Sequence, residues 1–234
     1  MQLTVRDVAE IFHVSESAVY RWIADQNLPA EEVNGQYHCN RAELLEWATI
    51  RRLQIPPRLI DPTRNGSGPL RLDEALAVGG VHYHVLGSDK AAVLQAVIGL
   101  LPLPADVDRD FLLQIMLSRE ASGSTAIGDG LALPHPRYPV VLPVPKPLIA
   151  LCFLDEAIVY GAKNDPPVHT LFCLVCPTVH VHLQLLARLG FALRDPAFRE
   201  IIRQRSPAEV ILQDAQRVEK LLQASGMADS EGAA

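Results

Sequence analysis

The sequence predicts an α/β fold, a mixed-sheet α/β sandwich preceded by a small helical domain with one hairpin. Between about residues 69 and 218, amphipathic segments alternate with short apolar runs, which is the pattern of helices that pack on a sheet. Residues 1–54 have the pattern of short helices. Residues 55–68, between the two parts, are rich in Pro, Gly and Ser, the composition of a linker.

Helices and short strands are both expected in the larger part. The helices cover about residues 88–100, 107–119 and 181–193, and a last one begins at the capping box of residues 206–209. The strands lie near residues 131–134, 148–154 and 168–176. We expect this domain to span residues 69–218. Residues 219–234, which end in small and polar residues, are predicted to form a flexible tail.

The composition is that of an ordinary soluble globular protein. Of the 234 residues, 49% are hydrophobic and 21% are charged, and the longest apolar runs are too short to cross a bilayer. The N-terminus is polar and has no signal-peptide pattern, so we expect a cytoplasmic protein without membrane insertion. The net charge of −6 gives no overall basic field, so any contact with DNA depends on a local patch.

The cysteines do not have the spacing of a disulfide framework. Cys173 and Cys176 have the C-x-x-C spacing of redox and zinc sites. However, they lie in an apolar run with the pattern of a strand, in which residues three positions apart point to opposite faces. No second cysteine pair is near them in the sequence. We therefore expect plain buried thiols.

The first part contains two short helices joined by a tight link. The first is expected over Thr4–Glu10 and the second over Ser15–Ile23, with Ser15 as its N-terminal cap. This is a helix-turn-helix, a motif whose second helix enters the major groove of DNA. An Asn-Gly pair at residues 34–35 predicts a hairpin, and Asn40 is placed to cap a third helix.

These residues resemble the excisionase and MerR-like family of winged helix-turn-helix domains. The match comprises Leu3-Thr-Val5, Val14-Ser15, Val19-Tyr-Arg-Trp-Ile23, Leu28-Pro29, the hairpin and the acidic helix that ends in Leu45-Glu-Trp47. In that family the second helix reads DNA and the hairpin wing contacts the backbone. The resemblance implies four candidate DNA contacts: Ser17, Tyr20, Arg21 and Gln36.

The charge of this domain departs from that of a DNA-binding module. Residues 1–60 hold six arginines and no lysine against eight acidic residues, a balance of −2. Glu31 and Glu32 lie in the expected wing, where DNA phosphates favour cations. DNA is therefore one candidate partner, and the alternative is a retained fold that now binds protein.

The stretch that surrounds His135 is the most informative part of the chain. Gly128-Asp-Gly130 predicts a turn, and the apolar residues after it predict a short strand. His135 lies between Pro134 and Pro136, and proline favours extended geometry in the residue that precedes it. The imidazole is thus held on a stiff backbone at a strand end. Because imidazole is largely neutral near pH 7, it is a good nucleophile for phosphoryl transfer.

Here the chain resembles the enzyme IIA domains of the sugar phosphotransferase system, of the fructose–mannitol type and within it the nitrogen-regulatory proteins. The shared motifs are the Arg-Glu pair at 119–120, the Gly-Ser-Thr at 123–125, Gly-x-Gly-x-Ala-x-Pro-His at 128–135, Pro167-Val168 and His182-Leu-Gln-x-Leu186. The resemblance covers about residues 69–218 and implies an enzyme IIA-like fold.

In that family a histidine at the position of His135 accepts a phosphoryl group from the phosphohistidine of an HPr-like carrier. The resemblance implies that His182 is the second active-site histidine and that Arg119 supports the site. Ser124 and Thr125 are candidate hydroxyl donors to the phosphoryl oxygens. The transfer requires no metal or nucleotide cofactor. One departure is Pro136, where the family usually has glycine; proline lacks an N–H, so that backbone donor is lost and transfer is expected to be slower or altered.

Structural roles compete with these assignments. His182 shares a helical stripe with Leu185, Leu186 and Leu189, and Arg119 sits where a cation caps a helix C-terminus. His169 and His180 add further histidines near by in the sequence, and a zinc site built on them is disfavoured.

The function predicted from these residues is that of a regulatory phosphocarrier of the bacterial phosphotransferase system, which signals through a DNA-binding-like domain. Its partners would be an HPr-like carrier and, as candidates, DNA and a regulated kinase or transporter. Two alternatives remain: a non-catalytic IIA-fold interaction module, and a transcription factor with a structural C-terminal domain. The joint presence of Arg119, His135 and His182 argues against the first, and the acidic wing argues against the second.

Overall fold

The computed structural model describes residues 2–26, 28–33, 35–51, 53, 70–136, 144–161 and 165–231. The chain divides into two compact units, Met1–Gly68 and Pro69–Ala234. The linker predicted at residues 55–68 lies outside the described residues, as does Asn34 of the predicted hairpin turn. No helix in the described ranges is both long and apolar enough to span a membrane.

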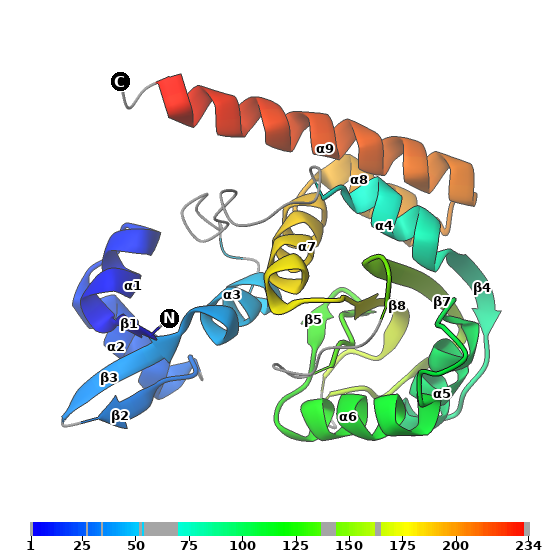
Figure 1. Ribbon diagram of the computed structural model, residues 1–234, viewed down its shortest axis with the longest axis horizontal. Coiled ribbons are helices and arrows are strands. Elements are labelled where there is room, and N and C mark those ends of the chain that lie inside the picture. The colour runs from blue at the N-terminus through cyan, green and yellow to red at the C-terminus, as the bar shows by residue number, and fades with distance from the viewer. Residues whose placement is uncertain are drawn as a thin grey trace. The chain divides into compact units, whose positions relative to one another are not determined.

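The first unit is a winged helix-turn-helix (Figure 1). Its elements are β1 (Gln2–Thr4), α1 (Val5–Phe12), α2 (Glu16–Asp25), β2 (Glu31–Val33), β3 (Gln36–Asn40) and α3 (Arg41–Ile50). The three strands form an antiparallel sheet in the order β1-β3-β2. His13 caps the C-terminus of α1 with a left-handed φ of 54°, and the Ser15 side chain caps α2 by accepting from the Ala18 N–H at 3.3 Å. The tight link predicted between the two helices is confirmed.

Apolar side chains from all three helices form the core of this unit. Val8, Val19, Leu44 and Leu45 are completely buried. The rings of Trp22 and Trp47 lie 5.3 Å apart, and the Trp47 indole donates to the Gln26 carbonyl at 3.0 Å. Both tryptophans therefore serve packing, as their positions in the sequence predict.

The second unit is built on a mixed sheet. Its strands are β4 (Val81–Val85), β5 (Ala126–Gly128), β6 (Leu131–Ala132), β7 (Leu148–Ile158) and β8 (Val168–Val175), in the order β4-β7-β8-β6-β5. The pairs β4–β7 and β6–β8 are parallel, and the pairs β7–β8 and β5–β6 are antiparallel. Residues of both parities along β7 are buried, from Leu148 to Leu154. The central strands therefore have packed layers on both faces.

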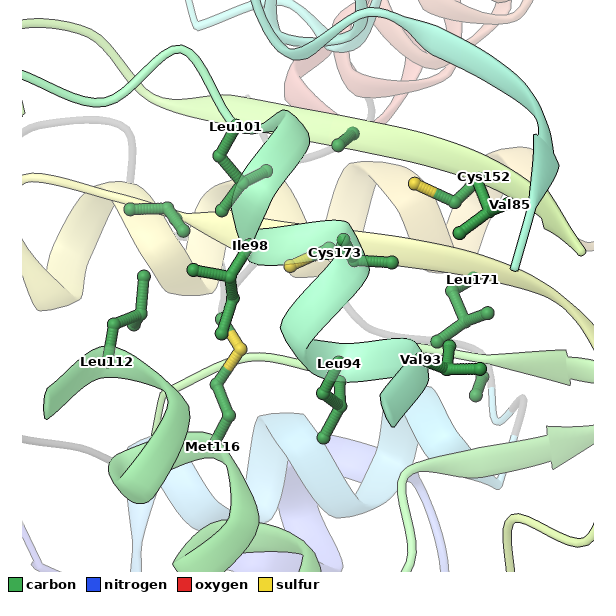
Figure 2. Packing of buried hydrophobic residues seen from close by; sticks show 14 of the residues in the cluster. Val85, Val93, Leu94, Ile98, Leu101, Leu112, Met116, Cys152, Leu171 and Cys173 are labelled. Atoms are coloured by element: carbon green, nitrogen blue, oxygen red, sulfur yellow. The ribbon is translucent and has the colours of Figure 1, made fainter. Parts of the chain in front are cut away.

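Helices supply these two layers (Figure 1). They are α4 (Leu72–Gly79), α5 (Lys90–Leu100), α6 (Arg109–Ala121), α7 (Val179–Ala192), α8 (Pro196–Arg203) and α9 (Ala208–Glu231). On one face, α5 and α6 contribute Val93, Leu94, Ile98, Leu112 and Met116 to a core with Cys152, Leu171 and Cys173 of the sheet (Figure 2). The predicted mixed-sheet α/β sandwich is confirmed.

The cysteines of this unit are buried in the same packing. Cys152 and Cys173 belong to the core against α5 and α6, and Cys176 follows β8. All four cysteines of the chain are free thiols with little or no exposed surface. Burial raises the pKa of Cys176 to about 12, which favours the protonated thiol over the nucleophilic thiolate at neutral pH.

The C-terminal helix differs from the predicted flexible tail. Helix α9 does not end near residue 218 but runs on to Glu231. Ile211, Ala215 and Val218 form its buried stripe, and Glu219, the next residue, is only 2% exposed. The Glu219 carboxylate accepts from the Leu72 N–H at the start of α4 at 2.7 Å, and it pairs with Arg188 of α7. Because three helices meet at this carboxylate, residue 219 belongs to the packed domain; residues 232–234 lie outside the described ones.

Candidate functional site

His135 lies directly beyond the short strand β6. Strand β6 runs parallel to β8, and the Leu174 N–H of β8 donates to the Pro134 carbonyl at 3.0 Å, which extends the pairing by two residues. The backbone at His135 is therefore restrained by the pairing with β8 and by the two flanking prolines. Its side chain is 1% exposed.

A backbone hydrogen bond determines which nitrogen of His135 carries the proton. Nδ1 lies 2.6 Å from the Leu133 carbonyl oxygen, which is an acceptor only. Nδ1 must therefore be the protonated nitrogen, and the lone pair of the neutral ring resides on Nε2. This tautomer makes Nε2 the nucleophilic atom.

His182 lies beside His135 although it comes from a different element. It is in the first turn of α7, and the centroids of the two rings are 5.1 Å apart at an interplanar angle of 45°. The His182 side chain is half-buried. The N-terminus of a helix carries partial positive charge and exposed N–H groups, a favourable setting for an anionic group.

Burial and a nearby guanidinium keep both rings neutral. Desolvation, and then the charge of Arg119, lower the pKa of His135 to about 4. The pKa of His182 is also lowered, first by desolvation and then by His135 and Arg119. Neutral imidazole is the form that accepts a phosphoryl group, so this environment favours nucleophilic chemistry at neutral pH.

Arg119 places a buried positive charge in this cluster. It occupies the last turn of α6 and is 9% exposed, and its Nη1 donates to the Gly123 carbonyl at 2.7 Å. The residue thus makes the helix-end contact that a purely structural role requires. Its positive charge also lowers the pKa of both histidines, after the larger effect of desolvation. The structure therefore brings the three predicted residues together: Arg119, His135 and His182.

The two predicted hydroxyl donors are placed differently. The Ser124 Oγ accepts from the Ala126 N–H at 3.2 Å, an arrangement that leaves its hydroxyl hydrogen available. The Thr125 side chain is completely buried, and its hydroxyl donates to the carboxylate of Glu120. Thr125 therefore directs its hydrogen at a carboxylate and not towards an incoming anion.

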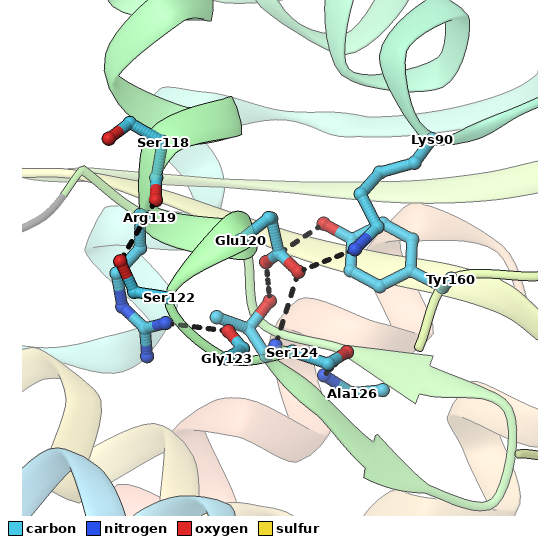
Figure 3. Close-up of polar contacts among 10 residues, drawn as sticks. Lys90, Ser118, Arg119, Glu120, Ser122, Gly123, Ser124, Ala126 and Tyr160 are labelled. Carbon is cyan, nitrogen blue, oxygen red and sulfur yellow. Dashed lines mark hydrogen bonds and ion pairs between the residues drawn. The ribbon is translucent and has the colours of Figure 1, made fainter. Parts of the chain in front are cut away.

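Sequence reasoning missed the surroundings of Glu120 (Figure 3). This residue follows Arg119 in the predicted Arg-Glu pair, but no role was predicted for it. It is 6% exposed and receives hydrogen bonds from Thr125, Tyr160 and Lys90. The signal that the sequence offers is an acidic residue next to an arginine in an apolar helix. Its partners are distant in the sequence, so no local pattern identifies them.

His169, another histidine of this region, has structural surroundings. The His169 ring packs so closely over Gly130 that a Cβ there would lie 2.3 Å from its Nε2. Its Nδ1 is 2.8 Å from the Thr170 hydroxyl. Within the described part of the chain, no group of three or more His, Cys, Asp or Glu side chains is arranged to hold a metal ion.

The predicted DNA contacts of the first unit are on its surface. Ser17, Tyr20 and Arg21 of α2 are exposed, as is Gln36 at the start of β3. The Tyr20 ring is 48% exposed and lies edge-on to Tyr37 of β3, with centroids 6.2 Å apart, so the helix and the wing share one aromatic contact.

The electrostatics of this surface remain unfavourable for DNA. Glu31 and Glu32 of β2 are exposed. Two of the arginines are engaged within the unit: Arg6 pairs with Glu10 at 3.1 Å, and Arg51 donates to the Gln26 carbonyl at 2.7 Å.

Two family profiles match the chain. The profile described as "Phosphoenolpyruvate-dependent sugar phosphotransferase system, EIIA 2" matches residues 78–216. The profile described as "Helix-turn-helix domain" matches residues 3–52. Together these matches account for both compact units.

Similar proteins are found among bacteria and archaea. The "Nitrogen regulatory protein" of Pseudomonas aeruginosa is 30% identical over 148 residues, which cover 62% of this chain and 94% of that protein. The "PTS system fructose-specific EIIA component" of Haloferax volcanii is 33% identical over 111 residues, which cover 45% of this chain and 70% of that protein.

Solved structures share the fold of the second unit. The crystal structure of the nitrogen regulatory protein IIA-Ntr from Neisseria meningitidis has a TM-score of 0.53 at 23% identity and covers 62% of this chain and 98% of that one. Enzyme IIA-Mtl from Escherichia coli, solved in complex with phosphorylated enzyme IIB-Mtl, has a TM-score of 0.50 at 19% identity and covers 58% of this chain and 93% of that one.

Proposed function

Because the chain belongs to the enzyme IIA type 2 family of the phosphoenolpyruvate-dependent sugar phosphotransferase system, we propose that it is a regulatory phosphocarrier. In this proposal His135 accepts a phosphoryl group from the phosphohistidine of an HPr-like carrier. The observation that carries the proposal is the hydrogen bond from His135 Nδ1 to the Leu133 carbonyl, since it directs the lone pair to Nε2.

The proposed step exchanges one P–N bond for another. The Nε2 lone pair of His135 attacks the phosphorus atom, and the P–N bond of the carrier's phosphohistidine breaks. The electron pair of that bond stays on the carrier's imidazole nitrogen. The proton on His135 Nδ1 remains in its hydrogen bond to Leu133. The step as written uses no metal or nucleotide, and its catalysis rests on alignment and on donors for the phosphoryl oxygens.

Arg119 and His182 are the proposed donors to the phosphoryl oxygens. A guanidinium offers fixed positive charge and several N–H groups, and neutral imidazole offers one N–H. The 5.1 Å between the two ring centroids supports this role for His182, and the lowering of the pKa of His135 by the Arg119 charge supports it for Arg119. Because the His135 side chain is 1% exposed, the carrier reaches Nε2 only after a neighbouring group moves aside. We propose that this movement accompanies docking of the carrier.

The N-terminal helix-turn-helix domain points to signalling as the purpose of the phosphorylation. Several relatives carry the name "Nitrogen regulatory protein", which describes regulation and not transport. We propose that the phosphorylation state of His135 is read out by the first unit or its partner. DNA, a regulated kinase and a transporter are the candidate targets.

Incubation of the full chain with a bacterial HPr phosphorylated on its histidine tests the proposal. We expect the intact mass to rise by one phosphoryl group, and the modification to be labile in acid. His135→Gln should lose the modification, and His180→Gln, a matched control on the neighbouring helix, should keep it. Undiminished labelling of His135→Gln would refute the assignment. Absence of labelling in the wild type, with HPr shown to donate to another acceptor, would favour the non-catalytic interaction module.

A further inference from the structure

The carboxylate of Glu120 is the centre of a buried polar network (Figure 3). Four donors surround it: the Lys90 ammonium at 3.1 Å, the Thr125 N–H at 3.3 Å, the Tyr160 hydroxyl at 3.3 Å and the Thr125 hydroxyl. A carboxylate offers about four lone-pair sites, so its capacity is filled. Lys90 supplies the compensating charge, and its Nζ also lies 4.7 Å from the centroid of the Tyr160 ring.

This network holds the connection between α6 and β5, residues 122–125, in one conformation. Glu120 binds Thr125 twice, once through the backbone N–H and once through the hydroxyl. The Gly123 N–H donates to the backbone carbonyl of Glu120 at 3.2 Å. Lys90 and Tyr160, which come from α5 and from the segment after β7, hold the carboxylate from the other side. The conformation of the connection therefore depends on Glu120.

Two contacts lead from this connection to the candidate site. The Gly123 carbonyl accepts from the Arg119 guanidinium at 2.7 Å. The Thr125 carbonyl accepts from the Leu133 N–H at 3.1 Å, and the Leu133 carbonyl accepts from His135 Nδ1 at 2.6 Å. The connection therefore contacts the Arg119 guanidinium through Gly123, and it reaches the His135 imidazole through Thr125 and Leu133.

We propose that Glu120 is a positioning residue for phosphoryl transfer, because it holds the connection that orients both Arg119 and His135. It acts through Gly123 and Thr125, and not on the phosphoryl group itself. The inference rests on the proposed function as far as the transfer is concerned. The orientation of the His135 ring can be measured without any transfer, so the two proposals fail separately.

The charges of the two neighbouring residues support this arrangement. Arg119 lowers the pKa of His135, and Glu120 acts on the same imidazole in the opposite direction. Glu120 is therefore close enough for its charge to be felt at His135. Lys90 and Tyr160 are the groups that fix where this charge lies.

Substitutions in the network separate positioning from stability. Glu120→Gln keeps the shape of the side chain but removes its charge and turns two acceptor sites into donors that face other donors. Thr125→Val removes a single hydroxyl and leaves the carboxylate in place, and Thr125→Ser restores that hydroxyl. Glu219→Gln is the matched control, because Glu219 is a carboxylate of similar burial that binds a backbone N–H and an arginine away from this connection.

Two measurements are made on each full-length variant. The first is the 15N chemical shift of both His135 ring nitrogens, which reports the fraction of the Nδ1–H tautomer in the unphosphorylated protein. The second is the rate constant of phosphoryl transfer from HPr phosphorylated on its histidine. Because displacement of a reacting group by about 1 Å can slow a reaction by about 100-fold, we expect losses of about 10- to 100-fold in Glu120→Gln and Thr125→Val.

The expected pattern is specific to positioning. Glu120→Gln and Thr125→Val should lower the fraction of the Nδ1–H tautomer, Thr125→Ser should restore it, and Glu219→Gln should lower the thermal midpoint without changing tautomer or rate. If Thr125→Val slows the transfer but keeps the wild-type fraction of the Nδ1–H tautomer, the hydroxyl acts directly on the phosphoryl group, and the inference is overturned. A wild-type tautomer fraction in folded Glu120→Gln and Thr125→Val would also overturn the inference. If Glu120→Gln does not fold, the two Thr125 variants decide. If the wild type accepts no phosphoryl group, the proposed function fails and the tautomer still decides the positioning.

Discussion

The imidazole rings of His135 and His182 lie 5.1 Å apart at 45° to each other, one at the end of a strand and the other in the first turn of a helix. His135 is buried, His182 is half-buried, and Arg119 lowers the pKa of both. A proton on either ring would be repelled by the guanidinium charge, with less solvent to screen it than at the surface. Both rings are therefore neutral at neutral pH.

This neutrality predicts a stability that depends on pH. The unfolded chain binds protons at the ordinary histidine pKa of about 6.5, whereas folded His135 binds one only near pH 4. Between these values the unfolded state holds more protons, so the free energy of unfolding should fall as the pH is lowered, by roughly 1.4 kcal/mol per pH unit for one fully responsive histidine.

Urea unfolding followed through the methyl signals of Leu151 and Leu171 measures this effect in the second unit. Both tryptophans belong to the first unit, so their fluorescence gives an internal comparison in the same sample. His135→Gln should flatten the dependence between pH 6 and pH 4. An unchanged slope in that variant would contradict the lowered pKa.

Substitution of the two site partners should slow transfer without creating a new acceptor. His182→Gln keeps an N–H donor and Arg119→Lys keeps the positive charge, but neither reproduces the geometry of the original donors. By analogy with the loss of an oxyanion donor, we expect transfer to slow by ~100-fold in Arg119→Lys. Stopped-flow transfer from phosphorylated HPr, together with thermal midpoints, measures both effects. Normal rates in both variants would leave His135 acting alone.

The turn before β6 offers a matched pair of glycines. Gly128 and Gly130 both have positive φ, 82° and 71°, but a Cβ on Gly128 would meet nothing within 4 Å, whereas one on Gly130 would meet the His169 ring. We expect Gly128→Ala to cost about 1–2 kcal/mol from backbone strain alone, and Gly130→Ala to cost more.

Chemical denaturation of the two variants gives the comparison, and Gly130→Ala combined with His169→Ala isolates the steric part. The double variant should recover stability towards that of Gly128→Ala. Equal losses in Gly128→Ala and Gly130→Ala would show that the ring moves aside without penalty.

Exposure predicts the order in which the histidines react with diethyl pyrocarbonate. The His84 side chain is 82% exposed and His135 is 1% exposed. Peptide mass spectrometry after brief treatment should therefore find His84 modified well before His135. Modification of His135 at a rate similar to that of His84 would mean that Nε2 is already accessible, and that carrier docking need not uncover it.

Binding of the first unit to DNA should be weak. Glu31 and Glu32 oppose phosphate, and few cations are available on this unit. If Arg21 contacts a phosphate, Arg21→Gln should weaken binding to all sequences similarly and reduce the slope of log K against log salt by about 1. If it reads a base, the loss should be confined to one sequence. Fluorescence anisotropy over a salt series distinguishes these cases, and an affinity that is unaffected would remove Arg21 from the interface.

Local chemistry explains which elements were predictable. The two flanking prolines and the Gly-Asp-Gly turn predicted the placement of His135 at a strand end, and the structure has it there. Strand β4 was missed because its sequence, Val-His-Tyr-His-Val, lacks an apolar run; it is an edge strand of the sheet, and two of its residues are exposed. Helix α8 was not among the predicted helices, although Asp195 followed by Pro196 is suited to an N-terminal cap and the first helical position.

Only those residues of the candidate site that lie in short sequence motifs were predictable. Arg119, His135 and His182 were predicted from such motifs, and the structure brings them together while their roles stay predictions. Thr125 was expected to face an anion, but the buried Glu120 carboxylate takes its hydroxyl. Lys90 comes from α5 and Tyr160 from the segment after β7, and only the tertiary fold brings them to Glu120.

The contact between Glu219 and the first N–H of α4 also has a consequence for synthesis on the ribosome. It joins residues 147 positions apart, almost the two ends of the second unit. The N-terminus of α4 therefore lacks this acceptor until residue 219 has been synthesised and has left the ribosome. The helices and strands of the first unit end at Ile50, so that unit completes its own contacts much earlier. During translation the first unit is therefore able to complete its own contacts while the second unit is still incomplete.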